Sequence, residues 1–161
     1  MASARRMGGM QASDIAVEVP TVSLDDPVTK AVKIMADRLL PGLIVVDQAY
    51  RPRAVLPGSQ VLRMIVAHNY QRDPALARTI DEAHADLFWQ ELGHRTVSDC
   101  LPPQPSKKVA VQADATLLEV AGLMARMHSP LVAVVASDGR LVGCITLSAL
   151  LLHLDLPDTT D

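Results

Sequence analysis

The side chains that perform acid–base, nucleophilic or metal chemistry are scattered along this 161-residue chain. The two cysteines, Cys100 and Cys144, lie far apart in the sequence and outside any reactive motif. No pair of histidines has the His-x-x-x-His spacing that places two metal ligands on one helical face. No glycine-rich phosphate loop is present either, so we predict neither catalysis nor a metal site. The histidines are His68, His84, His94, His128 and His153.

Composition narrows the class of protein further. Apolar residues make up 49% of the chain but aromatic residues only 2%, so the core must be aliphatic, which suits strands covered by helices. The net charge of −3 argues against a nucleic-acid partner. No apolar stretch reaches the roughly 18 residues that span a bilayer, so we expect no direct membrane insertion. With reduced cysteines and no secretory signal, a cytoplasmic location is expected.

An internal repeat organises most of the chain. Residues 22–65 align without a gap on residues 111–154, a shift from 22 to 111, and most positions keep their polarity. Such a match indicates two copies of one fold unit. The identical pairs include Asp25/Asp114, Met35/Met124, Ala36/Ala125, Pro41/Pro130, Val45/Val134, Val46/Val135, Arg51/Arg140, Ser59/Ser148 and Leu62/Leu151.

Each copy has the pattern strand, helix, strand, strand, helix. Apolar residues at helical spacing give each first helix one buried stripe, and short β-branched runs indicate buried strands. Asp26 can cap the first helix, and Asp114 or Thr116 the equivalent one. We predict an α+β fold of two pseudo-symmetric β-α-β-β-α repeats whose Met- and Leu-rich helices pack together. The expected elements are 21–24, 28–39, 43–46, 53–56 and 59–68, then 109–112, 117–127, 131–135, 141–145 and 148–154.

The remaining segments define the predicted boundaries. Short echoing segments, 12–15 and 97–100, are expected to form a helix entering each repeat. Asp73-Pro74 begins an inserted amphipathic helix that carries Phe88 and Trp89. This helix is either a structural strut or a surface on which a partner docks. The predicted parts are an N-terminal tail (1–10), a first repeat (11–68), the helical linker (69–95), a second repeat (96–154) and a C-terminal tail (155–161).

The repeat order, and the run Gly143-Cys144-Ile145-Thr146 leading into a helix, closely resemble the CBS (cystathionine-β-synthase) domain. Tandem pairs of this domain are called Bateman modules, and the resemblance covers residues 11–154. It implies a regulatory or binding module, not an enzyme. Members of the family commonly bind adenine nucleotides between paired repeats, through a Gly-apolar-x-Thr/Ser-x-x-Asp motif. The Thr or Ser lies at the start of a helix, where free N–H groups and the helix dipole favour binding of a phosphate, and the Asp accepts hydrogen bonds from the ribose hydroxyls.

Both copies depart from that motif. The first has Pro57 and Gln60 at the Thr and Asp places, and with Pro41 and Gly42 it forms a degenerate site. The second keeps Thr146 but has Ala149 at the Asp place. A missing charge-assisted hydrogen bond lowers affinity roughly ten- to a hundredfold. We therefore expect no nucleotide at the first site and weak ribose selection at the second.

The resemblance implies further ligand-binding positions around Thr146. Thr146 itself is either a helix cap alone or a cap that also contacts ligand. His128, at a helix end, can complement the helix dipole or a ligand phosphate. The other positions are equally compatible with plain core and turn roles. They are Val109, Ala110, Ser129, Pro130 and Leu131.

The resulting hypothesis is a stand-alone regulatory module that senses a small ligand between its repeats. AMP, ADP, ATP or S-adenosylmethionine are the ligands that the resemblance implies. The effector would be a separate protein, a transporter or an enzyme. We also expect a homodimer, because a single pair leaves an apolar helical face exposed. The alternative is a ligand-free scaffold that binds proteins through the inserted helix.

Overall fold

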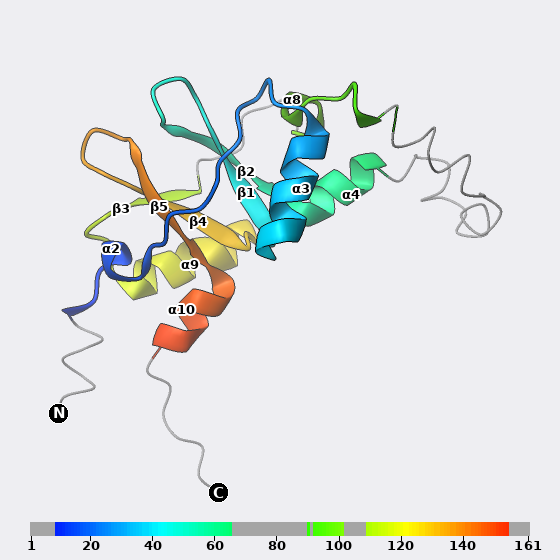
Figure 1. Ribbon diagram of the computed structural model, residues 1–161. Helices are drawn as coiled ribbons and strands as arrows, with labels where there is room; N and C mark the ends of the chain where they lie inside the picture. The colour runs from blue at the N-terminus through cyan, green and yellow to red at the C-terminus, as the bar shows by residue number, and fades with distance from the viewer. Residues whose placement is uncertain (1–8, 66–89, 91, 102–108, 155–161) are drawn as a thin grey trace, which may run out of the picture.

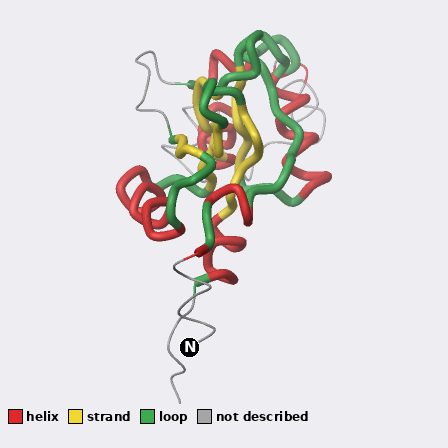
Figure 2. The backbone as a smooth tube through the Cα atoms, turned by 90° about the vertical axis from the view of Figure 1, so that its left-hand side faces the viewer, coloured by secondary structure: helices red, strands yellow, loops and turns green. Residues whose placement is uncertain are grey.

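The predicted α+β fold is present in the computed structural model, which describes residues 9–65, 90, 92–101 and 109–154 (Figure 1). The strands lie centrally and helices surround them (Figure 2). Most of the predicted inserted helix, with Phe88 and Trp89, falls outside the described residues. The elements are α2 (Ala12–Ile15), α3 (Val28–Arg38), β1 (Gly42–Val46), β2 (Pro52–Pro57), α4 (Gly58–Ile65), α8 (Val97–Cys100), β3 (Ala110–Gln112), α9 (Leu117–Met127), β4 (Leu131–Val135), β5 (Leu141–Thr146) and α10 (Leu147–His153).

The two copies share one strand register, which confirms the duplication. Gly42 pairs with Pro57 in the antiparallel β1–β2 hairpin, and Leu131 pairs with Thr146 in β4–β5. Each hairpin has a bulge at the same place, after Val45 in the first copy and after Val134 in the second. Every residue pair in the first hairpin therefore corresponds to a pair in the second hairpin through the sequence alignment of the two copies.

The first strand differs between the copies. In the second copy β3 pairs with β4 in parallel over three residues. In the first copy the predicted strand at 21–24 is reduced to one parallel bridge, Val22 with Val45. The chain turns at the same place in both copies, since the Asp26 N–H donates to the Ser23 carbonyl and the Ala115 N–H to the Gln112 carbonyl. The second copy has further bonds between its first strand and β4, from the Ala113 N–H to the Val135 carbonyl at 2.9 Å and from the Ala133 N–H to the Val109 carbonyl at 3.0 Å.

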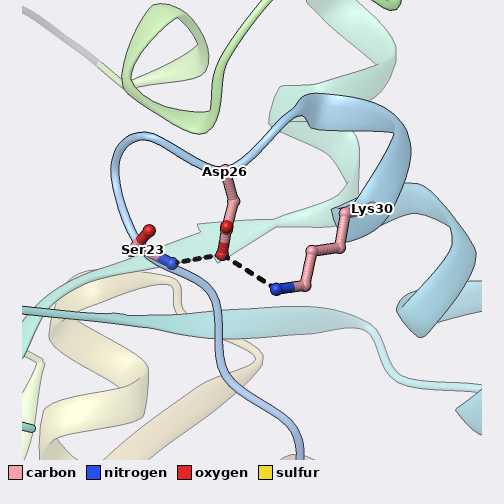
Figure 3. A network of polar contacts seen from close by, with 3 residues as sticks. All are labelled: Ser23, Asp26 and Lys30. Atoms are coloured by element: carbon pink, nitrogen blue, oxygen red, sulfur yellow. Dashed lines mark hydrogen bonds and ion pairs between the residues drawn. The ribbon is translucent and has the colours of Figure 1, made fainter.

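Asp26 does not cap α3, contrary to the sequence prediction (Figure 3). Its Oδ2 accepts the Ser23 N–H and is 3.3 Å from Lys30 Nζ, and these contacts, the Ser23 bond first, hold the Asp26 pKa below its ordinary value. The N–H of Val28, at the start of α3, donates instead to the Arg95 carbonyl. In the second copy Thr116 does cap α9, accepting from the Glu119 N–H at 3.1 Å.

The two repeats join through their sheets, so the prediction that their helices pack together is wrong. β1 and β2 both contact β4, and the residues between the sheets form one buried aliphatic cluster. The strands can bury both faces because nearly every side chain in β1 and β4 is apolar. The buried members of this cluster are Ile44, Val46, Leu131, Ala133, Leu141 and Cys144.

The short helices α2 and α8 form as predicted, but each packs on the repeat that it does not precede. The Ala12 N–H donates to the Ala115 carbonyl at 2.8 Å, and Ala12 and Ile15 belong to the core of the second repeat. In the same way the Val97 N–H donates to the Asp26 carbonyl at 2.8 Å, and α8 joins the core of the first repeat. The packing units therefore exchange their leading helices.

The chain that leaves α2 lies against β5 before it reaches the first repeat. Val17 and Cys144 exchange two backbone hydrogen bonds of 2.9 Å in an antiparallel bridge. A Cβ at Gly143 would lie 2.8 Å from the Val17 carbonyl oxygen, closer than side-chain atoms approach backbone. Gly143 is thus required for this close crossing, a role distinct from membership of a nucleotide motif.

Candidate ligand site between the repeats

Thr146 lies where β5 ends and α10 begins. Its half-buried hydroxyl accepts the Ala149 N–H at 3.2 Å and lies 3.2 Å from the Ser148 hydroxyl, so Thr146 is a helix cap. The Leu147 N–H is also engaged, donating to the Pro130 carbonyl at 3.1 Å. Of the first three N–H groups of α10, only that of Ser148 is left for a phosphate. The start of α10 therefore offers fewer free N–H donors than the resemblance to the family motif implies.

A groove of about 710 Å³ runs beside Thr146 and takes residues from both repeats. His128, Ser129 and Pro130 line it, as predicted for a ligand cleft, together with Pro41 and Pro57 of the degenerate site. Of the described residues lining the groove, His128 alone has a titratable side chain. The remaining lining, which sequence reasoning missed, is mostly apolar: Ser59, Ala121, Met124, Ala125, Leu147, Leu150, Leu151 and Leu154.

The loop before β4 has a turn that both copies share and a side-chain bond found in the second copy alone. His128 ends α9 in the left-handed conformation (φ 49°), as Leu39 does for α3 (φ 53°). The Ser129 hydroxyl donates to the Leu131 carbonyl at 2.6 Å, and Leu131 is fully buried. A ligand in the groove therefore meets a preformed loop with an exposed imidazole at its end.

The first copy uses its altered motif residues for packing. The Gly58 N–H donates to the Pro41 carbonyl at 2.9 Å, equivalent to the Leu147–Pro130 bond in the second copy. A Cβ at the buried Gly42 would lie 2.7 Å from the Leu56 carbonyl oxygen. Gln60 donates from Nε2 to the Cys100 carbonyl at 3.0 Å and so fastens α8 to the first repeat. Gln60 thus has a structural bond where the family motif has an acid.

Ala110 does not line the groove but a second hollow, of about 410 Å³. Ala110 lines it with Arg51 and Asp138, near the hairpin turns at the other end of the strands. The Val109 carbonyl is engaged with the Ala133 N–H at 3.0 Å. The structure therefore divides the predicted residues between two cavities, and ligand contacts at Thr146, Ala149, Val109 and Leu131 stay predictions.

The remaining reactive groups show no assembled centre. Burial raises the pKa of Cys144 to about 11, and burial followed by the nearby Asp99 raises that of Cys100 to about 11. Among residues 9–65, 92–101 and 109–154, no three His, Cys, Asp or Glu side chains gather as a metal site would require. Within the same part of the chain, no helix has the length and apolarity to span a membrane.

Comparison with solved structures identifies relatives of the whole arrangement. A CBS domain-containing protein of unknown function from Kribbella flavida is 46% identical, with a TM-score of 0.76, and the match covers 89% of this chain and 97% of that one. The CBS domain of a CBS domain-containing membrane protein from Sphaerobacter thermophilus is 26% identical, with a TM-score of 0.72, covering 97% and 94%.

A more distant structure carries a ligand. CBSX2, a CBS-pair protein from Arabidopsis thaliana, has been solved in complex with AMP; it is 20% identical, with a TM-score of 0.63, and the match covers 89% and 95% of the two chains. Among curated proteins, none is detectably similar in sequence. The sequence model of the CBS domain matches residues 97–155, which span α8 and the whole second repeat. Given the 46% identity over almost the full relative and the duplicated register, this chain belongs to the CBS domain family and contains a pair of CBS repeats.

Proposed function

We propose that this CBS pair is a regulatory module that senses an adenine nucleotide between its repeats and alters the state of a separate partner protein. The observation that carries the proposal is the groove beside Thr146, which draws its walls from both repeats. A ligand held there favours one mutual arrangement of the repeats over another, and this difference in affinity is what a regulatory switch needs.

The likeness to CBSX2 supports an adenine nucleotide as the ligand, because that CBS-pair fold holds AMP. Thr146 retains the hydroxyl of the family motif, and the exposed His128 provides a donor for a phosphate at the groove wall. The apolar lining suits the faces of a purine. Among the described residues that line the groove, none carries a carboxylate to accept hydrogen bonds from the ribose hydroxyls, so we expect weak binding.

Restoring the missing acid tests this assignment directly. Ala149→Asp places a carboxylate at the motif position, half-buried one turn into α10. We expect the dissociation constant for AMP to fall about ten- to a hundredfold, the value of a charge-assisted hydrogen bond. Isothermal titration calorimetry with AMP, ADP, ATP and S-adenosylmethionine measures the change.

Ser148→Asp is the matched control, since it adds the same charge to the same helical turn on an exposed neighbouring residue. The Ser148→Asp carboxylate should interact favourably with the helix dipole at the start of α10 without strengthening AMP binding. If neither wild type nor Ala149→Asp binds any of the four ligands at millimolar concentration, nucleotide sensing is excluded. That result would favour the alternative function, a protein-binding scaffold.

We also propose that the module works as a homodimer with twofold symmetry. The exposed leucines of α4 and α10 are related by the repeat: Leu62 is 59% exposed and its counterpart Leu151 is 52% exposed. Leu147 and Leu152 extend this apolar surface beside the groove. Because Leu62 and Leu151 are exposed apolar residues at equivalent positions of the two repeats, this surface suits an interface that places the same residues on both partners.

Charge on this surface should separate the subunits. For wild type we expect size-exclusion chromatography with light scattering to give twice the chain mass of 17.3 kDa. Leu151→Glu should give the monomer, because the interface would bury an unpaired charge. Leu118→Glu, on α9 at a site 74% exposed and outside the groove lining, should remain dimeric. A monomeric wild type at micromolar concentration would rule out the dimer.

A further inference from the structure

The hairpin turns of the two repeats lie together at the end of the strands opposite Thr146 (Figure 1). The Leu141 N–H donates to the Tyr50 carbonyl at 2.9 Å and so links the second hairpin to the first. The equivalent residue in the first copy is Pro52, which has no N–H, so the reciprocal bond cannot form. β5 spans six residues, which puts this region roughly 20 Å from Thr146.

The second hollow, of about 410 Å³, lies at this junction. Arg51 and Pro52 line it from the first repeat. The second repeat provides β3, Val135, Asp138 and Gly139. The Arg51 side chain crosses to the second hairpin, where its Nε lies 3.6 Å from the place that a Cβ on Gly139 would take. Gly139 has a φ of 87°, so glycine both forms the turn and leaves room for Arg51.

Opposite charges line this hollow without pairing. Among the described residues, the Arg51 guanidinium makes no hydrogen bond and no ion pair within 4 Å. The backbone N–H of Arg51 donates to Asp47, and this bond first, with the Arg51 charge as a smaller contribution, holds the Asp47 pKa below its ordinary value. Asp138 uses Oδ1 to accept the Arg140 N–H at 3.0 Å, which leaves Oδ2 available. A guanidinium and a carboxylate that line one cavity, yet do not bind each other, can hold a ligand that carries both charges.

The β3 strand adds backbone donors. The Val109 carbonyl and the Ala113 N–H both bond to β4, so the alternation of a parallel ladder turns the N–H groups of Ala110 and Gln112 away from β4. Ala110 and Gln112 both line the hollow. A carboxylate beside Arg51 would find a bidentate cation and neighbouring N–H groups.

We propose that this hollow is a second ligand site, which binds a small zwitterion of the free α-amino acid class. Arg51 holds its carboxylate and Asp138 its ammonium group. Because the binding groups come from both repeats, the ligand ties the hairpin ends together where Pro52 leaves one bond missing. The module then has a second input, remote from the groove beside Thr146.

Amide NMR spectra of the full chain, titrated with a mixture of neutral L-amino acids, test the site. We expect shifts at the amides of Gly139, Ala110 and Gln112. Acetate and methylamine, each with one of the two charges, should bind at least tenfold more weakly. Arg51→Gln should abolish the amino-acid response. Arg140→Gln, the same change at the duplicated position outside the hollow, should keep it.

Asp138→Asn tests whether the site binds a zwitterion or only an anion. The asparagine keeps an oxygen to accept the Arg140 N–H but removes the negative charge. The variant should bind the amino acids more weakly and bind acetate with unchanged affinity. The proposal fails if these amides do not respond, if acetate binds as well as the amino acids, or if Arg51→Gln and Arg140→Gln behave alike. Chemical-shift changes on adding AMP to the same samples test the groove separately. The proposal for one site can therefore be rejected while the other stands.

Discussion

Ile15→Ala will destabilise the second repeat and leave the first, which it precedes in the sequence, largely protected. Ile15 is only 5% exposed and packs in the core formed by α9, β4, β5 and α10. Truncation of a buried isoleucine to alanine costs about 2–5 kcal/mol in unfolding free energy. Native-state hydrogen exchange should therefore show faster exchange in β4 and β5 than in β1 and β2.

The duplication provides a counterpart for this experiment. Cys100 occupies on α8 the place of Ile15 on α2, is 4% exposed, and packs in the first core with its Sγ 3.5 Å from Met64 Sδ. Cys100→Ala removes fewer atoms, so we expect a smaller loss, confined to the first repeat. Accelerated exchange in α3 and β1 upon Ile15→Ala would contradict the exchange of helices between the two cores.

Gly143→Ala should lower the unfolding free energy by about 1–3 kcal/mol, although alanine suits a strand better than glycine. The added methyl would lie 2.8 Å from the Val17 carbonyl oxygen and 3.1 Å from its carbon. Val17 must then move away from β5, which breaks the two bonds it exchanges with Cys144. Equilibrium denaturation measures the loss.

Gly122→Ala is the control, because the only atom near its added methyl is a guanidinium nitrogen of Arg126 at 3.7 Å. In the interior of α9 this change should raise stability by about 0.5–1 kcal/mol. Thiol alkylation gives a second readout: the buried Cys144, with its pKa near 11, should react faster in Gly143→Ala. Equal stability of the two alanine variants would show that the crossing of Val17 over β5 is not tight.

The exchanged helices bear on how such a module transmits a signal. α2 is fixed to the second repeat by Ala12, and the same chain then forms the first repeat from Val22 onward. α8 is fixed to the first repeat, in part by Gln60. A change in the arrangement of the repeats must therefore move both connecting segments, so a ligand at either cavity acts on the whole pair.

Local chemistry was sufficient to predict the repeated unit. The ungapped shift between residues 22–65 and 111–154 anticipated both hairpins and the helices, because strand and helix patterns depend on residues close in sequence. Thr146 was correctly read as a cap on the same basis. The Asp26 cap was mispredicted, since the Asp26 carboxylate binds the Ser23 N–H instead. The strand at 21–24 was also mispredicted, since it pairs with β1 at Val22 alone.

By itself, then, the sequence determined the duplication, the hairpins and helices that both repeats share, and the aliphatic character of the core. The tertiary structure alone decided which surfaces meet: the sheets face each other, α2 and α8 change places, and Arg51 reaches Gly139 of the other repeat. Hydrophobic burial is nonspecific in direction, so an apolar stripe shows that a face is covered without showing by what. The partner of each face depends on chain connections and backbone bonds between residues far apart in the sequence, such as Val17 with Cys144.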